Sequence, residues 1–149
     1  KNKQPVVRTI EPYLLKEAQR RWYVLAWDVE KEALRGFGLD RIKHLDDERG
    51  VKFQHPVPEG VEHFFDDSFG AWVDNERTQA EEVVLAFKKL PTDSLFVPNP
   101  AEYLKAMPLH SSQEVMSETE DEIVLKLHLK ITPDFVKEIQ SYGSRVEWR

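Results

Sequence analysis

The sequence predicts an α+β protein in which a small antiparallel β-unit is followed by a ferredoxin-like βαββαβ unit. Short strand-like segments joined by polar turns fill the first 42 residues. The order strand, helix, strand, strand, helix, strand fills residues 80–149. Eight Phe, four Tyr and four Trp residues are enough to build a hydrophobic core in each unit.

Three strands are expected in the first unit, residues 1–49. Val6–Ile10 is rich in β-branched residues, and Tyr13–Leu15 can extend this strand past Pro12, which suits an edge or a bulge. Trp22–Trp27 alternates between two faces, and Ala33–Ile42 follows a charged turn. Short polar turns favour antiparallel neighbours, as in a small sheet or a partly open barrel. A barrel would need one or two further strands, so we expect this unit to be truncated at its N-terminus.

Residues 50–79 are expected to form a connector with one helical turn at Val61–Phe65. The second unit then covers residues 80–149. Its expected elements are strands at Glu82–Phe87, Ser112–Ser117, Ile123–Ile131 and Arg145–Trp148, and helices that start at Asn99 and Thr132. Both helix starts combine a capping side chain with a proline in the first turn. Alternating apolar residues in the third strand predict a sheet with one buried face.

Charge is distributed unevenly along the chain. The net charge is −6, but residues 1–49 hold 11 Lys and Arg against 9 Asp and Glu, whereas residues 50–149 hold 10 against 18. An acidic protein is poorly suited to non-specific binding of duplex DNA, and an anionic ligand would favour the first unit. The absence of cysteine and of any long apolar run predicts a cytoplasmic protein without a transmembrane helix.

No motif in the sequence predicts catalysis, a cofactor or a metal site. A nucleophile elbow, a P-loop and a dinucleotide fingerprint are all absent from the sequence. His55 and His63, with Asp66 and Asp67 nearby, come closest to a metal-binding group. They lie in a proline-rich segment and are expected to be surface residues. We therefore expect a protein that is not an enzyme.

The arginines of the first unit lie beside aromatic residues. On an unbroken strand, Arg35, Phe37 and Arg41 face the same side. Rings that stack on bases and guanidinium groups that hold phosphates are typical of nucleotide and single-stranded nucleic-acid sites. Six residues of strand would separate Arg35 and Arg41 by about 20 Å. The arginines therefore suit an extended polyanion, or a pocket completed by Arg8, better than one phosphate.

The alternative is a purely structural role for the same residues. Aromatic stripes usually form hydrophobic core, and Trp22, Tyr23 and Phe37 would then pack inside the unit. Arg41 would pair with Asp40 or with another acidic residue.

These residues resemble the WYL domain of bacterial transcriptional regulators. The motifs are Arg8-x-x-x-Pro12, Trp22-Tyr23-Val24 and Arg35-x-Phe37-x-Leu39-Asp40-Arg41-Ile42. The second unit resembles the C-terminal extension that follows this domain, through the strand Val83–Phe87, Tyr103-Leu104, Pro108-Leu109-His110 with Gln113, and Ser141-Tyr142-Gly143. Two features depart from the family: Val24 stands in place of leucine, and the usual N-terminal winged helix-turn-helix is not in this sequence.

The resemblance implies an SH3/Sm-like β-barrel that senses a ligand, followed by a ferredoxin-like extension often used in dimer contacts. The implied effector is a nucleotide or a short single-stranded nucleic acid. The candidate ligand-binding residues by motif position are Arg8, Tyr23, Arg35, Phe37 and Arg41. Asp40 is expected to orient an arginine rather than to touch an anion.

Three functions follow from this resemblance, in order of preference. The first is the effector-sensing part of a homodimeric regulator that contacts operator DNA only through a missing N-terminal domain. The second is a structural oligomerisation module in which the arginines form salt bridges between subunits. The third is an enzyme acting on a nucleotide.

Overall fold

The computed structural model describes residues 5–47, 50–73, 78–90 and 99–149, and the chain divides into two compact units. Unit 1 consists of residues 1–66 and 70–77, and unit 2 of residues 67–69 and 78–149. The described strands form antiparallel sheets, and both described α-helices belong to unit 2. The predicted α+β class is therefore confirmed. Neither α-helix of the described residues is long and apolar enough to cross a membrane.

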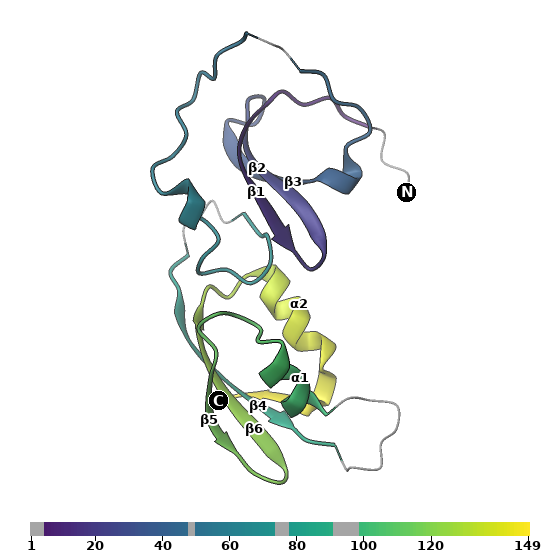
Figure 1. Cartoon of the computed structure of the whole chain (residues 1–149), viewed down its shortest axis with the longest axis vertical. Helices are drawn as coiled ribbons and strands as arrows, with labels where there is room; N and C mark the ends of the chain where they lie inside the picture. Colours follow the sequence, from purple (N-terminus) through teal and green to yellow (C-terminus); the bar gives the residue numbers. More distant parts are fainter. Residues whose placement is uncertain (1–4, 48–49, 74–77, 91–98) are drawn as a thin grey trace. The chain divides into compact units, whose positions relative to one another are not determined.

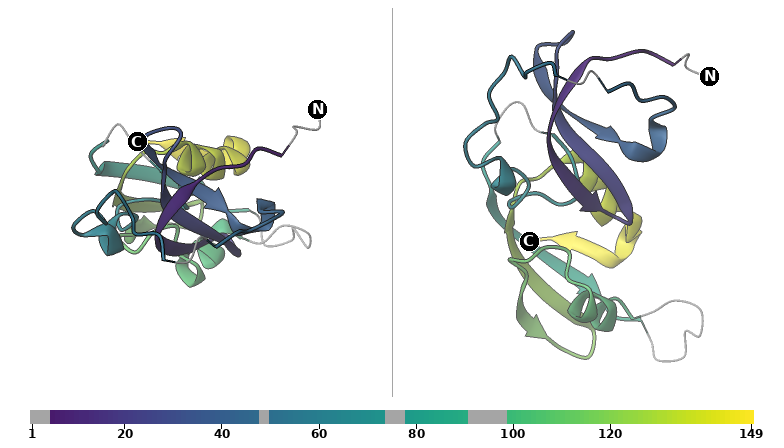
Figure 2. Two further views of the ribbon diagram at one scale, coloured as in Figure 1. Left: turned by 90° about the horizontal axis from the view of Figure 1, so that it is seen from above. Right: turned by 45° about the horizontal axis from the view of Figure 1, so that its top comes forward.

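Unit 1 contains a three-stranded antiparallel sheet in the order β1-β2-β3 (Figure 1). Its strands are β1 (Ile10–Ala18), β2 (Arg21–Asp28) and β3 (Ala33–Gly38). The right-hand view of Figure 2 shows β1 and β2 side by side as a long hairpin.

The first strand begins later than predicted, and it includes the expected extension past Pro12 and runs on to Ala18. Residues 6–9, predicted as strand, lie outside the strands, whereas β1 continues through Pro12 to Ala18. The register with β2 shifts between Pro12 and Leu14. Such a bulge at a sheet edge accommodates proline, which has no N–H group to donate to a neighbouring strand.

The third strand is shorter than predicted. An unbroken strand over Ala33–Ile42 was expected, but β3 ends at Gly38 and Leu39–Arg41 forms the 3₁₀ turn η1. A Cβ atom at Gly38 would lie 2.7 Å from Asp40 Oδ1, so a larger residue here would have to displace the Asp40 side chain. Arg41 therefore does not share a strand face with Arg35, and that prediction was wrong.

The turn between β1 and β2 is strained. Ala18 pairs with Arg21, and the two residues between them, Gln19 and Arg20, have positive φ angles of 51° and 62°. This is the geometry of a type I′ hairpin, which favours Asn-Gly, because other residues pay about 1–2 kcal/mol each in this conformation.

Replacing the two turn residues together, Gln19→Asn with Arg20→Gly, is expected to raise the free energy of unfolding of unit 1 by about 1 kcal/mol. Chemical denaturation measures the change. The double alanine variant at the same two positions is the control, because it removes the same side chains and keeps the strained backbone. Equal stability of the two double variants would contradict the strain argument.

The described residues of unit 2 form four strands and two α-helices in the order β4-α1-β5-β6-α2-β7. Their bounds are β4 Glu81–Lys88, α1 Pro100–Ala106, β5 Glu114–Glu118, β6 Glu122–Leu129, α2 Pro133–Ser141 and β7 Val146–Trp148. The strands form one antiparallel sheet in the order β5-β6-β4-β7. Both helix starts are capped as predicted: Asn99 accepts a hydrogen bond from the N–H of Ala101, and Thr132 from that of Phe135.

The hydrophobic core of unit 2 lies between one face of this sheet and the two helices (Figure 1). Alternate residues of β4 and β6 point into it, and for β6 the period of two in the sequence predicted this. Its buried members are Val83, Leu85, Phe87, Ala101, Leu104, Ile123, Leu125, Leu127, Leu129, Phe135 and Ile139. The helix α2 contributes Phe135 and Ile139, which are spaced by one helical turn.

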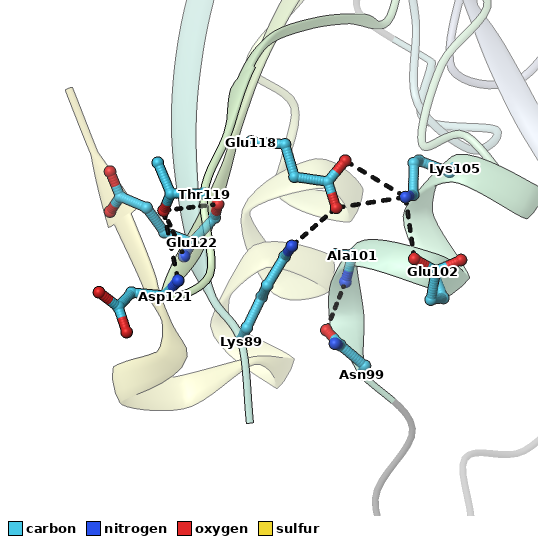
Figure 3. Close-up of polar contacts among 9 residues, drawn as sticks. All are labelled: Lys89, Asn99, Ala101, Glu102, Lys105, Glu118, Thr119, Asp121 and Glu122. Carbon is cyan, nitrogen blue, oxygen red and sulfur yellow. Dashed lines mark hydrogen bonds and ion pairs between the residues drawn. The ribbon is translucent and has the colours of Figure 1, made fainter. Parts of the chain in front are cut away.

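Ion pairs connect neighbouring elements of unit 2. Glu118 of β5 lies between two lysines, with Lys89 Nζ 2.7 Å from Oε1 and Lys105 Nζ 3.2 Å from Oε2 (Figure 3). The hydrogen bonds from Lys89 and Lys105 lower the pKa of Glu118. Because Lys105 lies on α1 and Lys89 directly follows β4, this carboxylate links three elements of the unit.

Candidate functional site

One face of the unit 1 sheet is covered by the residues that follow it. Glu11 is buried, and its carboxylate accepts hydrogen bonds from the N–H groups of Gln54 (2.6 Å) and His55 (3.0 Å) and from His55 Nδ1 (3.0 Å). The His55 ring stacks on Trp27, the cross-strand partner of Glu11, at 4.7 Å between ring centroids. His55, predicted to be a surface residue, is therefore a half-buried anchor. The part of this face around Glu11 and Trp27 is therefore closed to a ligand.

The Glu11 anchor is expected to make unit 1 sensitive to acid. Burial raises the pKa of Glu11, but the hydrogen bonds from Gln54 and His55 outweigh it and leave the pKa below its ordinary value. A carboxylate with a lowered pKa stabilises the fold above the unfolded value of about 4.3, and this stability is lost as the pH falls through the folded pKa.

We therefore expect Glu11→Gln to be less stable than the wild type at pH 7, with a difference that shrinks towards pH 3. Urea denaturation at both pH values measures it. Glu17→Gln, an exposed change on the same strand, should alter stability little at either pH. A Glu11→Gln effect that stays constant with pH would contradict a role for the ionised carboxylate.

The opposite face of the sheet carries the arginines. Alternation along β2 places Trp22, Val24, Ala26 and Asp28 on this face. The register pairs Ala26 with Arg35 and Val24 with Phe37, and cross-strand partners point to the same side. The predicted sharing of a face by Arg35 and Phe37 therefore agrees with the register.

Two arginines approach one buried carboxylate on this face. Asp28 is fully buried, and its Oδ2 lies 3.8 Å from Arg35 Nε and 4.0 Å from Arg8 Nε. The other oxygen, Oδ1, accepts a hydrogen bond of 3.1 Å from the N–H of Lys31 in the following turn. We call Arg8, Asp28 and Arg35 the arginine site. The fold thus brings together two of the five candidate residues, which lie on different segments of the chain.

The arginines of this site keep free hydrogen-bonding capacity. Both distances to Asp28 exceed the length of a hydrogen bond, and Oδ2 has no hydrogen-bond partner within the described part of the chain. The Arg8 and Arg35 side chains are 32% and 50% exposed. Each guanidinium carries five N–H donors, so an incoming anion can be bound without breaking an existing hydrogen bond to Asp28.

A second carboxylate lies near this site. Glu30 is exposed and accepts hydrogen bonds of 3.0 and 3.1 Å from the N–H of Thr9, next to Arg8. The backbone N–H of Thr9 lowers the pKa of Glu30. With two arginines and two carboxylates, the formal charge here is zero. Recognition of an anion would therefore depend on directed N–H donors more than on a long-range field.

The remaining two candidates, Tyr23 and Arg41, lie elsewhere. Tyr23 pairs with Gly38, so alternation places it on the face opposite to Arg35. A Cβ at Gly38 would lie 3.7 Å from Tyr23 Cε1 and 3.8 Å from Arg41 Cδ, so each of these side chains lies next to the glycine. Asp40 pairs at 3.8 Å with Arg21, which is exposed and is not one of the candidate residues.

Sequence reasoning missed Asp28, which was assigned to a charged turn. The signal was present: Asp28 is in phase with Val24 and Ala26, so it ends the strand on the face that the arginines use. A carboxylate at such a position needs a cationic partner once it is buried.

Comparison with known proteins identifies the first unit. The family model of the WYL domain matches residues 1–47. No curated protein matches the sequence. The proteasome accessory factor B/C (PafBC) of Arthrobacter aurescens is a structural neighbour with a TM-score of 0.39 and 18% sequence identity, over 98% of this chain and 20% of that chain. This chain thus spans about a fifth of that protein, and a similarity this low supports no argument about fold or function. By the match to its first 47 residues, which contain β1, β2 and β3, this chain carries a WYL domain.

Proposed function

We propose that this chain is the ligand-sensing part of a bacterial transcriptional regulator, and that unit 1 binds a nucleotide or a short single-stranded nucleic acid. The observation that carries the proposal is the approach of Arg8 and Arg35 to one buried carboxylate, on the sheet face that also holds Phe37. The WYL match of residues 1–47 supports the same class of protein.

The proposal includes a finer assignment of both folds. Unit 1 would be part of an SH3/Sm-like barrel, and unit 2 the ferredoxin-like extension. The element order β4-α1-β5-β6-α2-β7 and the sheet order β5-β6-β4-β7 support the second assignment. The sheet face of unit 2 that points away from the helices carries the ion pairs Lys88–Glu147 and Lys126–Glu114.

In this proposal the arginines bind the phosphate groups of the ligand, and an aromatic ring binds a base. Guanidinium groups bind phosphate oxygens through paired, charge-assisted hydrogen bonds, each worth about 1.5–3 kcal/mol. Phe37, two residues beyond Arg35 on the same face, would stack on a base. Asp28 would hold the two guanidinium groups near each other in the absence of ligand.

Regulation would require a second state of the molecule. A ligand shifts a conformational equilibrium only by its differential affinity for the two states, so the proposed effector must bind one arrangement of a homodimer better than another. Operator DNA would be contacted by a helix-turn-helix domain in the same regulator. In this proposal the protein is neither an enzyme nor a cofactor carrier.

The alternative is an oligomerisation module without a small ligand. The observation that favours it is the balance of charge around the arginine site, where Asp28 and Glu30 offset Arg8 and Arg35. Balanced clusters of this kind are common as structural ion pairs.

The test is to titrate a labelled single-stranded oligonucleotide at about 50 mM and about 200 mM salt, with the oligomeric state measured by light scattering in the same buffers. Binding that weakens with salt is expected, because bound phosphates release counterions. A stable oligomer that binds no oligonucleotide at the lower salt concentration would favour the alternative.

A further inference from the structure

We infer that Trp22 is a second stacking residue of the arginine face, and that this face takes a short single strand in preference to one nucleotide. The inference rests on the proposed function of unit 1 and deepens it by naming the length of the ligand. Trp22 is the first tryptophan of β2. The sequence motif includes it, but it was not among the five candidate ligand-binding residues.

The strand register sets the order of side chains along this face. Arg35 lies opposite Ala26, and Phe37 lies opposite Val24. Trp22 comes two residues before Val24 on β2 and points to the same side. A path along the face therefore meets Arg35 first, then Phe37, and then Trp22.

The exposure of these residues fits a binding surface. Trp22 is 51% exposed, and Leu15, the cross-strand partner of Val24, is exposed as well. Phe37 is half-buried between them and the arginine site. A single exposed aromatic residue is ordinary on a protein surface. Here the ring is in line with a second aromatic ring and two guanidinium groups, which is the arrangement of a single-strand binding surface.

The spacing decides how long the ligand has to be. Phe37 is two residues from Arg35, about 7 Å along the strand, which one nucleotide can span from phosphate to base. Trp22 lies four residues before the partner of Arg35, about 13 Å along β2. A mononucleotide held by Arg35 would therefore engage Phe37 alone. A second base is needed to reach Trp22.

Glu17 bears on which end of this face would hold the phosphate groups of the ligand. It pairs with Trp22 in the register, so its carboxylate lies beside the ring on the same face. A negative charge there repels phosphate, whereas Arg8 and Arg35 attract it at the other end. The phosphates that are held tightly therefore belong at the arginine end, and the Trp22 end receives a base.

The experiment compares two probes on the same variants: adenosine monophosphate by calorimetry, and a labelled strand of about six nucleotides by fluorescence anisotropy. Trp22→Leu is expected to weaken the strand about tenfold, since one base stack is worth about 1–3 kcal/mol, and to leave the mononucleotide within about twofold. Phe37→Leu should weaken both probes. Glu17→Gln should tighten the strand by about twofold.

Matched controls separate stacking from a general loss of aromatic surface. Trp72→Leu removes another exposed tryptophan of unit 1, in the segment that contacts Gly36 on the covered face, and should leave both affinities unchanged. Trp22→Phe keeps a ring and should restore most of the strand affinity. The unfolding midpoint of Trp22→Leu should match that of the wild type, because the ring is exposed.

The outcomes distinguish this inference from the proposed function. A wild type that binds neither probe overturns both. A wild type that binds the strand equally well with and without Trp22 overturns the inference alone. Equal affinity of the wild type for the mononucleotide and the strand also overturns it, because the second base would then add nothing.

Discussion

Replacing Arg35 by alanine is expected to weaken the binding of a single-stranded oligonucleotide by about 10- to 100-fold, because the variant loses charge-assisted hydrogen bonds worth about 1.5–3 kcal/mol. Arg35 is half-exposed, but the change leaves Arg8 as the remaining cation beside the buried Asp28, so the unfolding midpoint of the variant is measured as well. The slope of log affinity against log salt should fall by about one, the signature of one lost phosphate contact. Anisotropy titrations at several salt concentrations measure both quantities.

Three further variants sharpen this prediction. Arg35→Lys keeps the charge but loses the planar fork, so it should bind with intermediate affinity. Arg41→Ala should have a smaller effect than Arg35→Ala, because Arg41 lies beside Gly38 and Tyr23. Lys137→Ala, an exposed change on α2, controls for a loss of one positive charge. If Arg35→Ala and Lys137→Ala bind alike, the arginine site does not contact the ligand.

Replacing Phe135 by alanine is expected to destabilise unit 2 by about 3–5 kcal/mol, the usual cost of truncating a buried aromatic residue. Phe135 is fully buried, with Phe69 5.9 Å and Trp148 5.9 Å away between ring centroids. Phe69 belongs to the short segment 67–69, which is joined to unit 2 by a hydrogen bond of 2.7 Å from the N–H of Lys130 to the carbonyl of Asp67. The cavity would thus open between α2, this segment and β7.

Urea denaturation followed by circular dichroism measures the effect on unit 2. Tyr103→Ala is the control, since it also removes an aromatic ring but from an exposed position on α1, and should cost less than about 1 kcal/mol. A loss below 1 kcal/mol for Phe135→Ala would mean that the core around Trp148 is not closely packed.

The sequence by itself determined the elements of unit 2, because their signals are local. Asn99 and Thr132 stand at the helix starts, and each side chain accepts a bond from an N–H only two or three residues ahead. The strand that ends at Leu129 needs only the period of two in its own residues to identify its buried face. Such features are set within a few residues and can be read without knowing the rest of the fold.

The sequence determined less of unit 1, because its strand ends depend on contacts between turns and neighbouring strands. It predicted correctly that Arg35 and Phe37 share a face, since both lie on β3 at a spacing of two. It placed Arg41 with them because nothing in the composition showed that the strand stops at Gly38. The 3₁₀ turn that ends the strand, Leu39–Arg41, is visible only in the structure.

Only the tertiary structure assembled the arginine site. Arg8, Asp28 and Arg35 come from three segments, and no spacing along the chain relates them. Their meeting depends on the register of β2 with both neighbouring strands, and a shift by one residue would turn each side chain to the other face. The charged residues can be named from the sequence, but which of them lie together depends on how the strands of the sheet are aligned.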